Sequence, residues 1–317
     1  MNIYANQTNV TDFSLTFLRL VMQLTMSTFT GSFSSFSGEL YYYNPNTDIE
    51  QPSFYIYRLN DGNKLFIGTR GTIDINDVAA DIAIRQIVTD KGVYLEGYYR
   101  AALFVYKYAY AFIKNHDGPI YFIGHSMGGA ISTILHCLAK FDFRNSKDIN
   151  TIALAPVPAI SESLNKTYGD KIVTIINSDD VVPTISIANM YAFLVKYEPL
   201  IPITMFPWSF IKKTINFVLS IVYHVSSVFS QQVLEYFKLA LSSALDELVS
   251  YAKKEKQFLI RYPPGAVYQL SIESPLYLNQ SLINASDKLN ILSLSLHAIN
   301  AHDPSQYIKL LNVTLGD

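Results

Sequence analysis

Ser126 lies between two glycines in the sequence Gly124-His125-Ser126-Met127-Gly128. An apolar run at 120–123 precedes this motif and Gly129-Ala130-Ile131 follows it, which predicts a buried strand, a sharp turn and a helix. Such a turn leaves no room for side chains beside the serine, so glycine is required there. A chain with 14 glycines can contain this spacing by chance, but the strand and helix around it favour a serine nucleophile that attacks an ester or amide carbonyl.

A serine nucleophile of this kind is followed along the chain first by an acid and then by a base. Asp179 and Asp180 come directly after a β-branched run at 171–176 that predicts a strand. Either carboxylate could orient a histidine, and an aspartate in a surface turn is the structural alternative. We favour Asp180, because the apolar pair Val181-Val182 that follows it would draw it toward the core.

Three histidines follow these acids, at His224, His297 and His302. His224 falls in a segment of different composition, where it is expected to pack or to lie on a helix surface. His297 and His302 are both possible bases. We favour His302, because the turn sequence Asp303-Pro304 follows it and an imidazole on a loop is well placed to move protons.

The oxyanion of a tetrahedral intermediate needs two hydrogen-bond donors. Met127 would supply its backbone N–H at the start of the predicted helix, where the helix dipole is positive. A second donor is expected from the loop that ends the predicted strand 64–68. Thr72 could give its N–H and hydroxyl there, and Gly71 would allow close approach of the backbone. Arg70 is either a surface ion-pair residue or a clamp that holds this loop.

Together these motifs resemble those of the fungal-type (class 3) lipases and their diacylglycerol-lipase relatives. The matching residues are Arg70-Gly71-Thr72 with Asp77 and Asp81, the serine motif with Gly129-Ala130, Asp179-Asp180-Val181-Val182-Pro183, Pro263-Pro264-Gly265-Ala266-Val267, and His302 with Tyr307. The resemblance implies an α/β-hydrolase fold and a triad of Ser126, Asp180 and His302. The chain departs from secreted members in lacking disulfides, and Val78 stands near the place of their lid tryptophan.

The composition fits one large domain or a domain with an insertion. The chain has 317 residues, of which 50% are hydrophobic and 16% charged, and its net charge is −2. This balance provides a core and argues against nucleic acid as a partner. Cys137 is the only cysteine, so no intrachain disulfide can form, and we expect it to be a small buried residue.

The N-terminus predicts an intracellular protein, either cytoplasmic or peripherally associated with a membrane. Residues 1–11 lack a basic region, and Asp12 precedes the apolar stretch 13–26. That stretch has one apolar helical face, so it is interpreted as a helix that enters the domain rather than as a signal peptide.

The order of predicted elements indicates an α/β fold with a mostly parallel central sheet, flanking helices and a helical cap insertion. A turn at 60–63 between two apolar runs predicts a β-hairpin. The remaining predicted helices are 77–87, 97–114 and 127–141, and the remaining predicted strands are 120–123, 151–155, 171–176 and 266–270.

The core is assigned to residues 1–185 and 257–317, and residues 186–256 are assigned to the insertion. The insertion contains three prolines, the only tryptophan (Trp208) and two predicted helices at 210–229 and 231–256. Its first helix is apolar almost all round, which suits either a cap over the core or a lipid-facing anchor lying on a membrane surface.

The sequence therefore predicts a serine carboxylester hydrolase that cleaves acylglycerols through an acyl-enzyme. Phospholipase A1 or general esterase activity is the alternative within the same chemistry. A catalytically inactive, lipid-binding protein of the same fold is the alternative from another class. We expect a lipid ester substrate, possible contact of 186–256 with a lipid surface, and no cofactor or metal, since no histidine pair has metal-ligand spacing with carboxylates.

Overall fold

The computed structural model describes residues 14–46, 48, 50–71, 86–177, 179–186, 188–189, 260–270 and 296–311. The two helices predicted at 210–229 and 231–256 lie outside these residues, as does the predicted helix 77–87 up to residue 85. The two described residues of that helix, Gln86 and Ile87, begin a strand instead.

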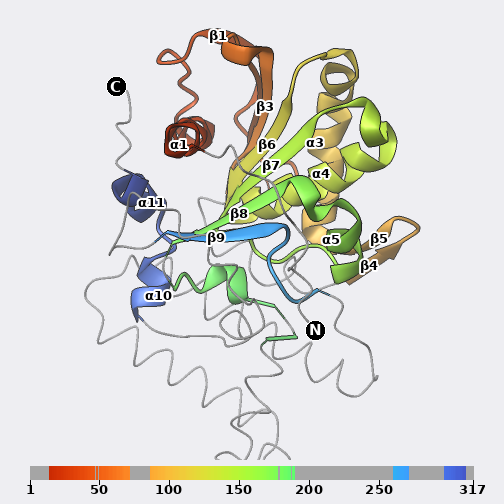
Figure 1. Ribbon diagram of the computed structural model, residues 1–317, viewed down its shortest axis with the longest axis vertical. Helices are drawn as coiled ribbons and strands as arrows, with labels where there is room; N and C mark the ends of the chain where they lie inside the picture. The colour runs from red at the N-terminus through yellow and green to blue at the C-terminus, as the bar shows by residue number, and fades with distance from the viewer. Residues whose placement is uncertain are drawn as a thin grey trace, which may run out of the picture.

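A seven-stranded sheet runs through the molecule in the order β1-β2-β3-β6-β7-β8-β9 (Figure 1). Its strands are β1 (Gly38–Asn44), β2 (Phe54–Leu59), β3 (Lys64–Thr69), β6 (Ile120–His125), β7 (Ile149–Leu154), β8 (Ile172–Asn177) and β9 (Ala266–Leu270). From β3 to β9 all neighbours pair in parallel, and β2 and β1 extend the sheet in antiparallel pairing. Parallel strands bring their carboxyl ends to one edge, so the residues after β6 and β8 meet there.

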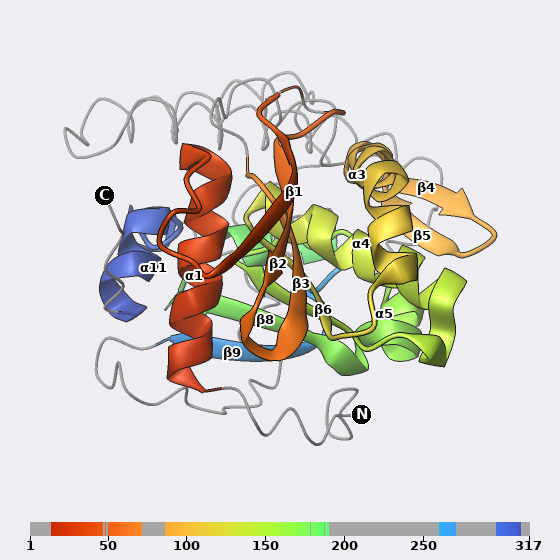
Figure 2. The same cartoon turned by 90° about the horizontal axis from the view of Figure 1, so that it is seen from above.

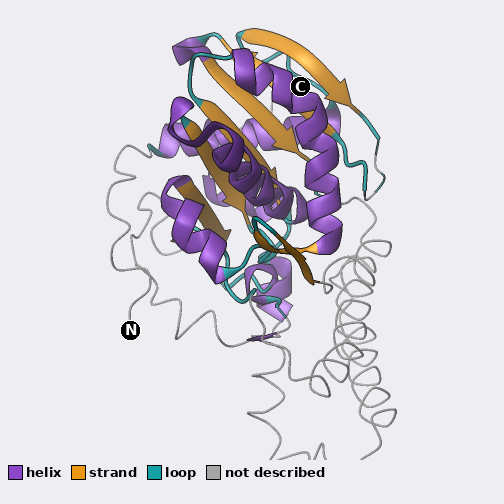
Figure 3. Ribbon diagram, turned by 90° about the vertical axis from the view of Figure 1, so that its right-hand side faces the viewer, coloured by secondary structure: helices purple, strands orange, loops and turns teal. Residues whose placement is uncertain are grey.

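Helices cover both faces of this sheet (Figure 2, Figure 3). Helices α1 and α11 pack on one face, and α3, α4 and α5 lie on the other. The helices are α1 (Leu15–Thr30), α3 (Glu96–Asn115), α4 (Met127–Phe143), α5 (Glu162–Tyr168), α10 (Leu296–Asn300) and α11 (Pro304–Leu311). The predicted layout of a mostly parallel sheet with flanking helices is confirmed.

The alternation of side chains along each strand produces two hydrophobic cores. On β2, Phe54 and Ile56 join the core beneath α3 and α4, whereas Tyr55 and Tyr57 join the core beneath α1 and α11. All four side chains are at most 2% exposed. A strand that is buried on both faces carries a continuous apolar run, which is why these segments lack a polar face in the sequence.

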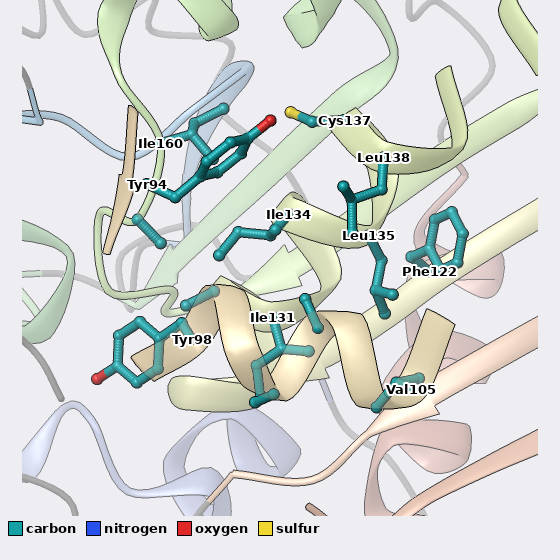
Figure 4. Close-up of a cluster of buried hydrophobic side chains, with 14 of the residues drawn as sticks. Tyr94, Tyr98, Val105, Phe122, Ile131, Ile134, Leu135, Cys137, Leu138 and Ile160 are labelled. Atoms are coloured by element: carbon teal, nitrogen blue, oxygen red, sulfur yellow. The ribbon is translucent and has the colours of Figure 1, made fainter. Parts of the chain in front are cut away.

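Helix α4 follows the serine motif and is held firmly on the first of these faces. Its side chains share one core with those of α3 and β6, and Figure 4 shows Ile131, Ile134 and Leu135 of α4 in the same cluster as Val105 of α3 and Phe122 of β6. Cys137 lies in the same core, 1% exposed, and burial raises the pKa of its thiol, which fits the predicted role of a small buried residue.

Three elements of the structure had no clear signal in the sequence. Edge strand β1 has a register shift between Leu40 and Tyr42, which breaks the alternation of period two. A small separate hairpin is formed by β4 (Gln86–Thr89) and β5 (Gly92–Leu95), and α5 is only 7 residues long. Each of these elements is short or irregular, so its local pattern is weak.

Candidate active site

Ser126 occupies the turn between β6 and α4 in a backbone conformation that serine rarely adopts. Its φ is 57° and its ψ is −123°. The Ser126 N–H donates to the Leu154 carbonyl at 2.9 Å, and the Ser126 carbonyl accepts the first hydrogen bond of the helix from Ala130 at 3.0 Å. The surrounding strand and helix therefore hold the serine in a strained turn, as expected for a nucleophile elbow.

The two flanking glycines are needed because backbone lies where a side chain would be. A Cβ added to Gly124 would be 2.4 Å from the Gly128 carbonyl, and one added to Gly128 would be 2.2 Å from the carbonyl oxygen of Thr69. Thr69 is anchored in return, since its hydroxyl donates to the Gly128 carbonyl at 2.9 Å. The predicted reason for glycine in this motif is thus confirmed, and the motif also fixes strand β3 against the turn.

His302 lies in the turn between α10 and α11, 176 residues after the serine. Its Nε2 is 3.0 Å from Ser126 Oγ. Its Nδ1 is 3.1 Å from Asp180 Oδ1 and 3.0 Å from Oδ2. The side chain of Asp180 is fully buried and that of His302 is 13% exposed. The three residues favoured from the sequence therefore form one continuous hydrogen-bonded chain.

The carboxylate of Asp180 is fixed by two further donors. The Val182 N–H donates to Oδ1 at 2.9 Å, and the Tyr307 hydroxyl donates to Oδ2 at 2.8 Å. Tyr307 itself accepts from the Asn177 N–H at 2.8 Å, so its only proton is directed to the carboxylate. Burial and the charge of Asp180 raise the pKa of Tyr307 well above its usual range.

The turn that carries His302 is tied to the end of β8. The Asn177 side chain donates to the Ala301 carbonyl at 2.8 Å, and the Val181 N–H donates to the Ala298 carbonyl at 3.2 Å. The sequence indicated Tyr307 only as an aromatic residue that matches the family pattern after His302, and it did not indicate the role of Asn177 in holding this turn. The signal for Asn177 was weak, since an asparagine at a strand end is usually a turn residue.

The alternative acid and base form a second pair beside the first. His297 Nδ1 lies 2.5 Å from Asp179 Oδ1, and these side chains are 61% and 42% exposed. They are therefore paired with each other on the surface, while the favoured pair is buried beside Ser126. His224 lies outside the described residues.

Only one of the two expected oxyanion donors can be located. Met127 is the first residue of α4 and is 5% exposed. Thr72 lies outside the described residues, but its neighbour Gly71 approaches the elbow, since an added Cβ would be 2.8 Å from the His125 carbonyl oxygen. Gly71 thus lies directly against the serine turn.

Arg70 is buried, so its interpretation as a surface ion-pair residue is wrong. It is 8% exposed, and its guanidinium lies 4.7 Å from the centre of the Phe29 ring on α1. Burial lowers the pKa of Arg70 from its usual value. The contact fastens the loop to α1, in agreement with the clamp that was predicted as the alternative.

The described part of the chain contains neither a cluster of metal-binding side chains nor a membrane-spanning helix. Those residues contain no cluster of three or more histidine, cysteine or acidic side chains that could hold a metal ion. None of the helices described is long and apolar enough to cross a membrane.

Comparison with known protein families gives one match. Residues 66–190 match the family model for lipase (class 3), and this segment is less than half of the chain. The segment is therefore similar to class 3 lipases. It includes Ser126 and Asp180, whereas His302 lies beyond it.

The chain is also similar to several solved structures, and no curated protein sequence matches it. For the Lip2 lipase of Yarrowia lipolytica, identity is 18% and the TM-score is 0.45, with 54% of this chain and 73% of that chain covered. For the triacylglyceride lipase of Rhizomucor miehei, identity is 14% and the TM-score is 0.47, with 54% of this chain and 74% of that chain covered. For a triacylglycerol lipase from Penicillium expansum, identity is 19% and the TM-score is 0.46, with 54% of this chain and 72% of that chain covered.

Proposed function

We propose that this protein is a lipase that hydrolyses acylglycerol esters through a covalent acyl-enzyme formed on Ser126. The observation that carries the proposal is the position of the His302 ring. One of its nitrogens is 3.0 Å from Ser126 Oγ, and the other is 3.0 Å from Asp180. An imidazole held between a hydroxyl and a buried carboxylate is arranged to remove the hydroxyl proton.

In the first half of the reaction, Ser126 Oγ attacks the acyl carbonyl carbon while His302 Nε2 takes the hydroxyl proton. The tetrahedral intermediate collapses as His302 gives that proton to the departing alcohol, which leaves the acyl group on Ser126. In the second half, water gives a proton to His302 as it attacks the acyl carbonyl, and the second tetrahedral intermediate collapses as His302 returns that proton to Ser126 Oγ, which releases the fatty acid. Asp180 keeps its charge throughout and stabilises the imidazolium.

We assign the oxyanion donors to the backbone N–H of Met127 and to Thr72. The support for Met127 is its place at the positive end of α4, directly after the nucleophile. The support for Thr72 is the approach of Gly71 to the elbow. Donors of this kind contribute on the order of 3 kcal/mol each to stabilising the transition state.

We also propose that residues 186–256 form an insertion that caps the core. Asn189 lies near the start of this segment, and Arg261 follows its end in the sequence. The Asn189 side chain donates to the Arg261 carbonyl, and the Arg261 guanidinium donates to the Asn189 side chain, both at 3.3 Å. The two ends of the segment are therefore joined, as an insertion into a complete domain requires. Its apolar composition suits an acyl chain.

The assignment of the triad is tested with a fluorophosphonate probe, which labels an activated serine. We expect rapid labelling of the purified wild-type protein and none of Ser126→Ala. The second histidine–aspartate pair supplies matched controls: His297→Ala and Asp179→Asn should retain most labelling, whereas His302→Ala and Asp180→Asn should lose it. Equal damage from the two pairs would contradict the assignment, and an unlabelled wild-type protein would contradict the proposed function.

The substrate class is tested separately with tri-, di- and monoacylglycerols and phospholipids. We expect acylglycerols to be hydrolysed fastest. Faster release of fatty acid from the sn-1 position of phospholipids would replace this proposal with phospholipase A1 activity.

A further inference from the structure

His125, the residue before the nucleophile, has no part in the proposed triad, yet its side chain lies against it. It is the last residue of β6 and is 3% exposed. The centre of its ring is 4.8 Å from that of His302, with an angle of 30° between the two planes. The two rings are tilted relative to each other, and their centres are within the range of about 4.5–7 Å found for interacting aromatic rings.

The same ring also contacts the residue that holds the acid. The Tyr307 ring packs edge-on against His125, with centres 5.4 Å apart and planes at 76°. His125 therefore contacts both the base and the tyrosine that donates to Asp180. Because its backbone is the end of β6, this support is built on the same rigid strand that carries Ser126.

The polar atoms of His125 account for only part of its contacts. Its ring has a hydrogen bond with the backbone of His302. Its Nε2 is buried and has no hydrogen-bond partner among the described residues. An unpaired buried nitrogen destabilises a fold, so the nitrogens alone do not favour a histidine here. The ring itself contacts the rings of both His302 and Tyr307.

His125 is also suited to a neighbour that becomes charged. Burial, with the nearby His302 as the second cause, lowers the pKa of His125 well below its usual range. The hydrogen bond with the backbone of His302 raises the pKa of His125 but does not reverse the shift. When His302 takes up the serine proton, His125 stays neutral and does not repel it. A neutral aromatic face is an attractive surface for a cation.

We propose that His125 is a positioning residue that supports the His302 imidazole at the correct distance from Ser126 Oγ. The inference rests on the proposed function, since it assumes that His302 acts as the base. It assigns to the ring face of His125, rather than to its nitrogens, the task of keeping His302 from turning away from the serine.

The test compares two variants of His125 with a matched control elsewhere in the protein. His125→Phe keeps a flat ring, and His125→Ala removes it. The control is His136→Ala, because His136 is also a fully buried histidine whose Nε2 has no partner among the described residues, but it contacts Thr151 rather than the triad. Thermal unfolding of all three variants separates loss of stability from loss of function.

The rate of labelling by the fluorophosphonate probe should stay within about threefold of wild type in His125→Phe and His136→Ala. In His125→Ala it should fall on the order of ten- to a hundredfold, the size expected when a catalytic group is misplaced by about 1 Å. With an ester substrate, kcat should fall in the same proportion and KM should stay unchanged. If His125→Ala does not fold, His125→Leu fills similar space without a flat ring and should show the same loss.

Three results would overturn the inference: wild-type rates in His125→Ala, equal losses in His125→Ala and His136→Ala, or a His125→Phe variant as slow as His125→Ala. The last result would assign the role to the ring nitrogens. A wild-type protein that the probe does not label would contradict the proposed function instead. A proton NMR signal from the His302–Asp180 hydrogen bond gives a readout without substrate: it should persist in His125→Phe and broaden or disappear in His125→Ala.

Discussion

The strained backbone at Ser126 leads to a prediction about stability that does not involve the reaction. With φ at 57° and ψ at −123°, the residue lies in a region where any side chain is unfavourable. Such a conformation costs about 1–3 kcal/mol for a residue other than glycine. Replacement by glycine removes that strain, whereas replacement by alanine keeps it, and both remove the hydroxyl. The difference in unfolding free energy between Ser126→Gly and Ser126→Ala therefore reports the backbone contribution without that of the hydroxyl.

The expected difference in unfolding free energy between the two variants has two opposing contributions. Relief of strain favours the glycine variant by about 1–3 kcal/mol. The greater freedom of glycine in the unfolded chain favours the alanine variant by about 0.5–1 kcal/mol. At the midpoints of these two ranges, Ser126→Gly should be more stable than Ser126→Ala by about 1 kcal/mol, which for a protein of this size raises Tm by roughly 2 °C.

Urea and thermal unfolding of the two variants measure this difference directly. The control is the same pair of substitutions at Ser132, which lies inside α4 and is fully buried. There the order should be reversed, because glycine in a helix is less stable than alanine by about 1 kcal/mol. A Ser126→Gly variant no more stable than Ser126→Ala would refute the argument that the elbow stores strain in the backbone.

Three more predictions follow from the site and the core. Tyr307→Phe removes a donor to Asp180 and leaves the Asn177 N–H unpaired, so it should lower the unfolding free energy by about 2–3 kcal/mol and kcat by about tenfold, as measured by denaturation and steady-state kinetics. Gly128→Ala should abolish probe labelling and destabilise the fold, because its Cβ would meet the Thr69 carbonyl oxygen at 2.2 Å; a labelled variant would contradict this. Burial lowers the pKa of His136 to about 3, so its neutral form is favoured in the folded state; stability should fall as the pH drops from about 6.5 toward 3, and urea titrations should show a weaker fall in His136→Gln.

The arrangement of the core could be predicted because its signals are local. The runs that became β6 and β8 are short, apolar and rich in β-branched residues, as buried parallel strands require. The helix after the serine was predicted as 127–141 and is observed as Met127–Phe143. The small hairpin of β4 and β5 was missed because its strands are 4 residues each and depend on tertiary contacts.

The contacts that complete the site were harder to predict, because they join distant parts of the chain. Tyr307 and Asn177 are 130 residues apart and meet through one hydrogen bond. His125 lies in the serine motif between Gly124 and Ser126, but the motif does not indicate which side chains its ring contacts. That contact depends on where the turn after α10 returns to the sheet.

The two neighbouring acids differ in their surroundings rather than in their chemistry. Asp179 and Asp180 are adjacent and chemically identical, and each pairs with a histidine from the same C-terminal segment. Burial separates them: Val181 and Val182 are fully buried, and they draw Asp180 inward. A carboxylate that is buried with its partners fixed can hold an imidazole in one orientation, whereas an exposed pair is screened by water and contributes little. The apolar residues that follow an acid along the chain can thus indicate which of two adjacent carboxylates orients the base.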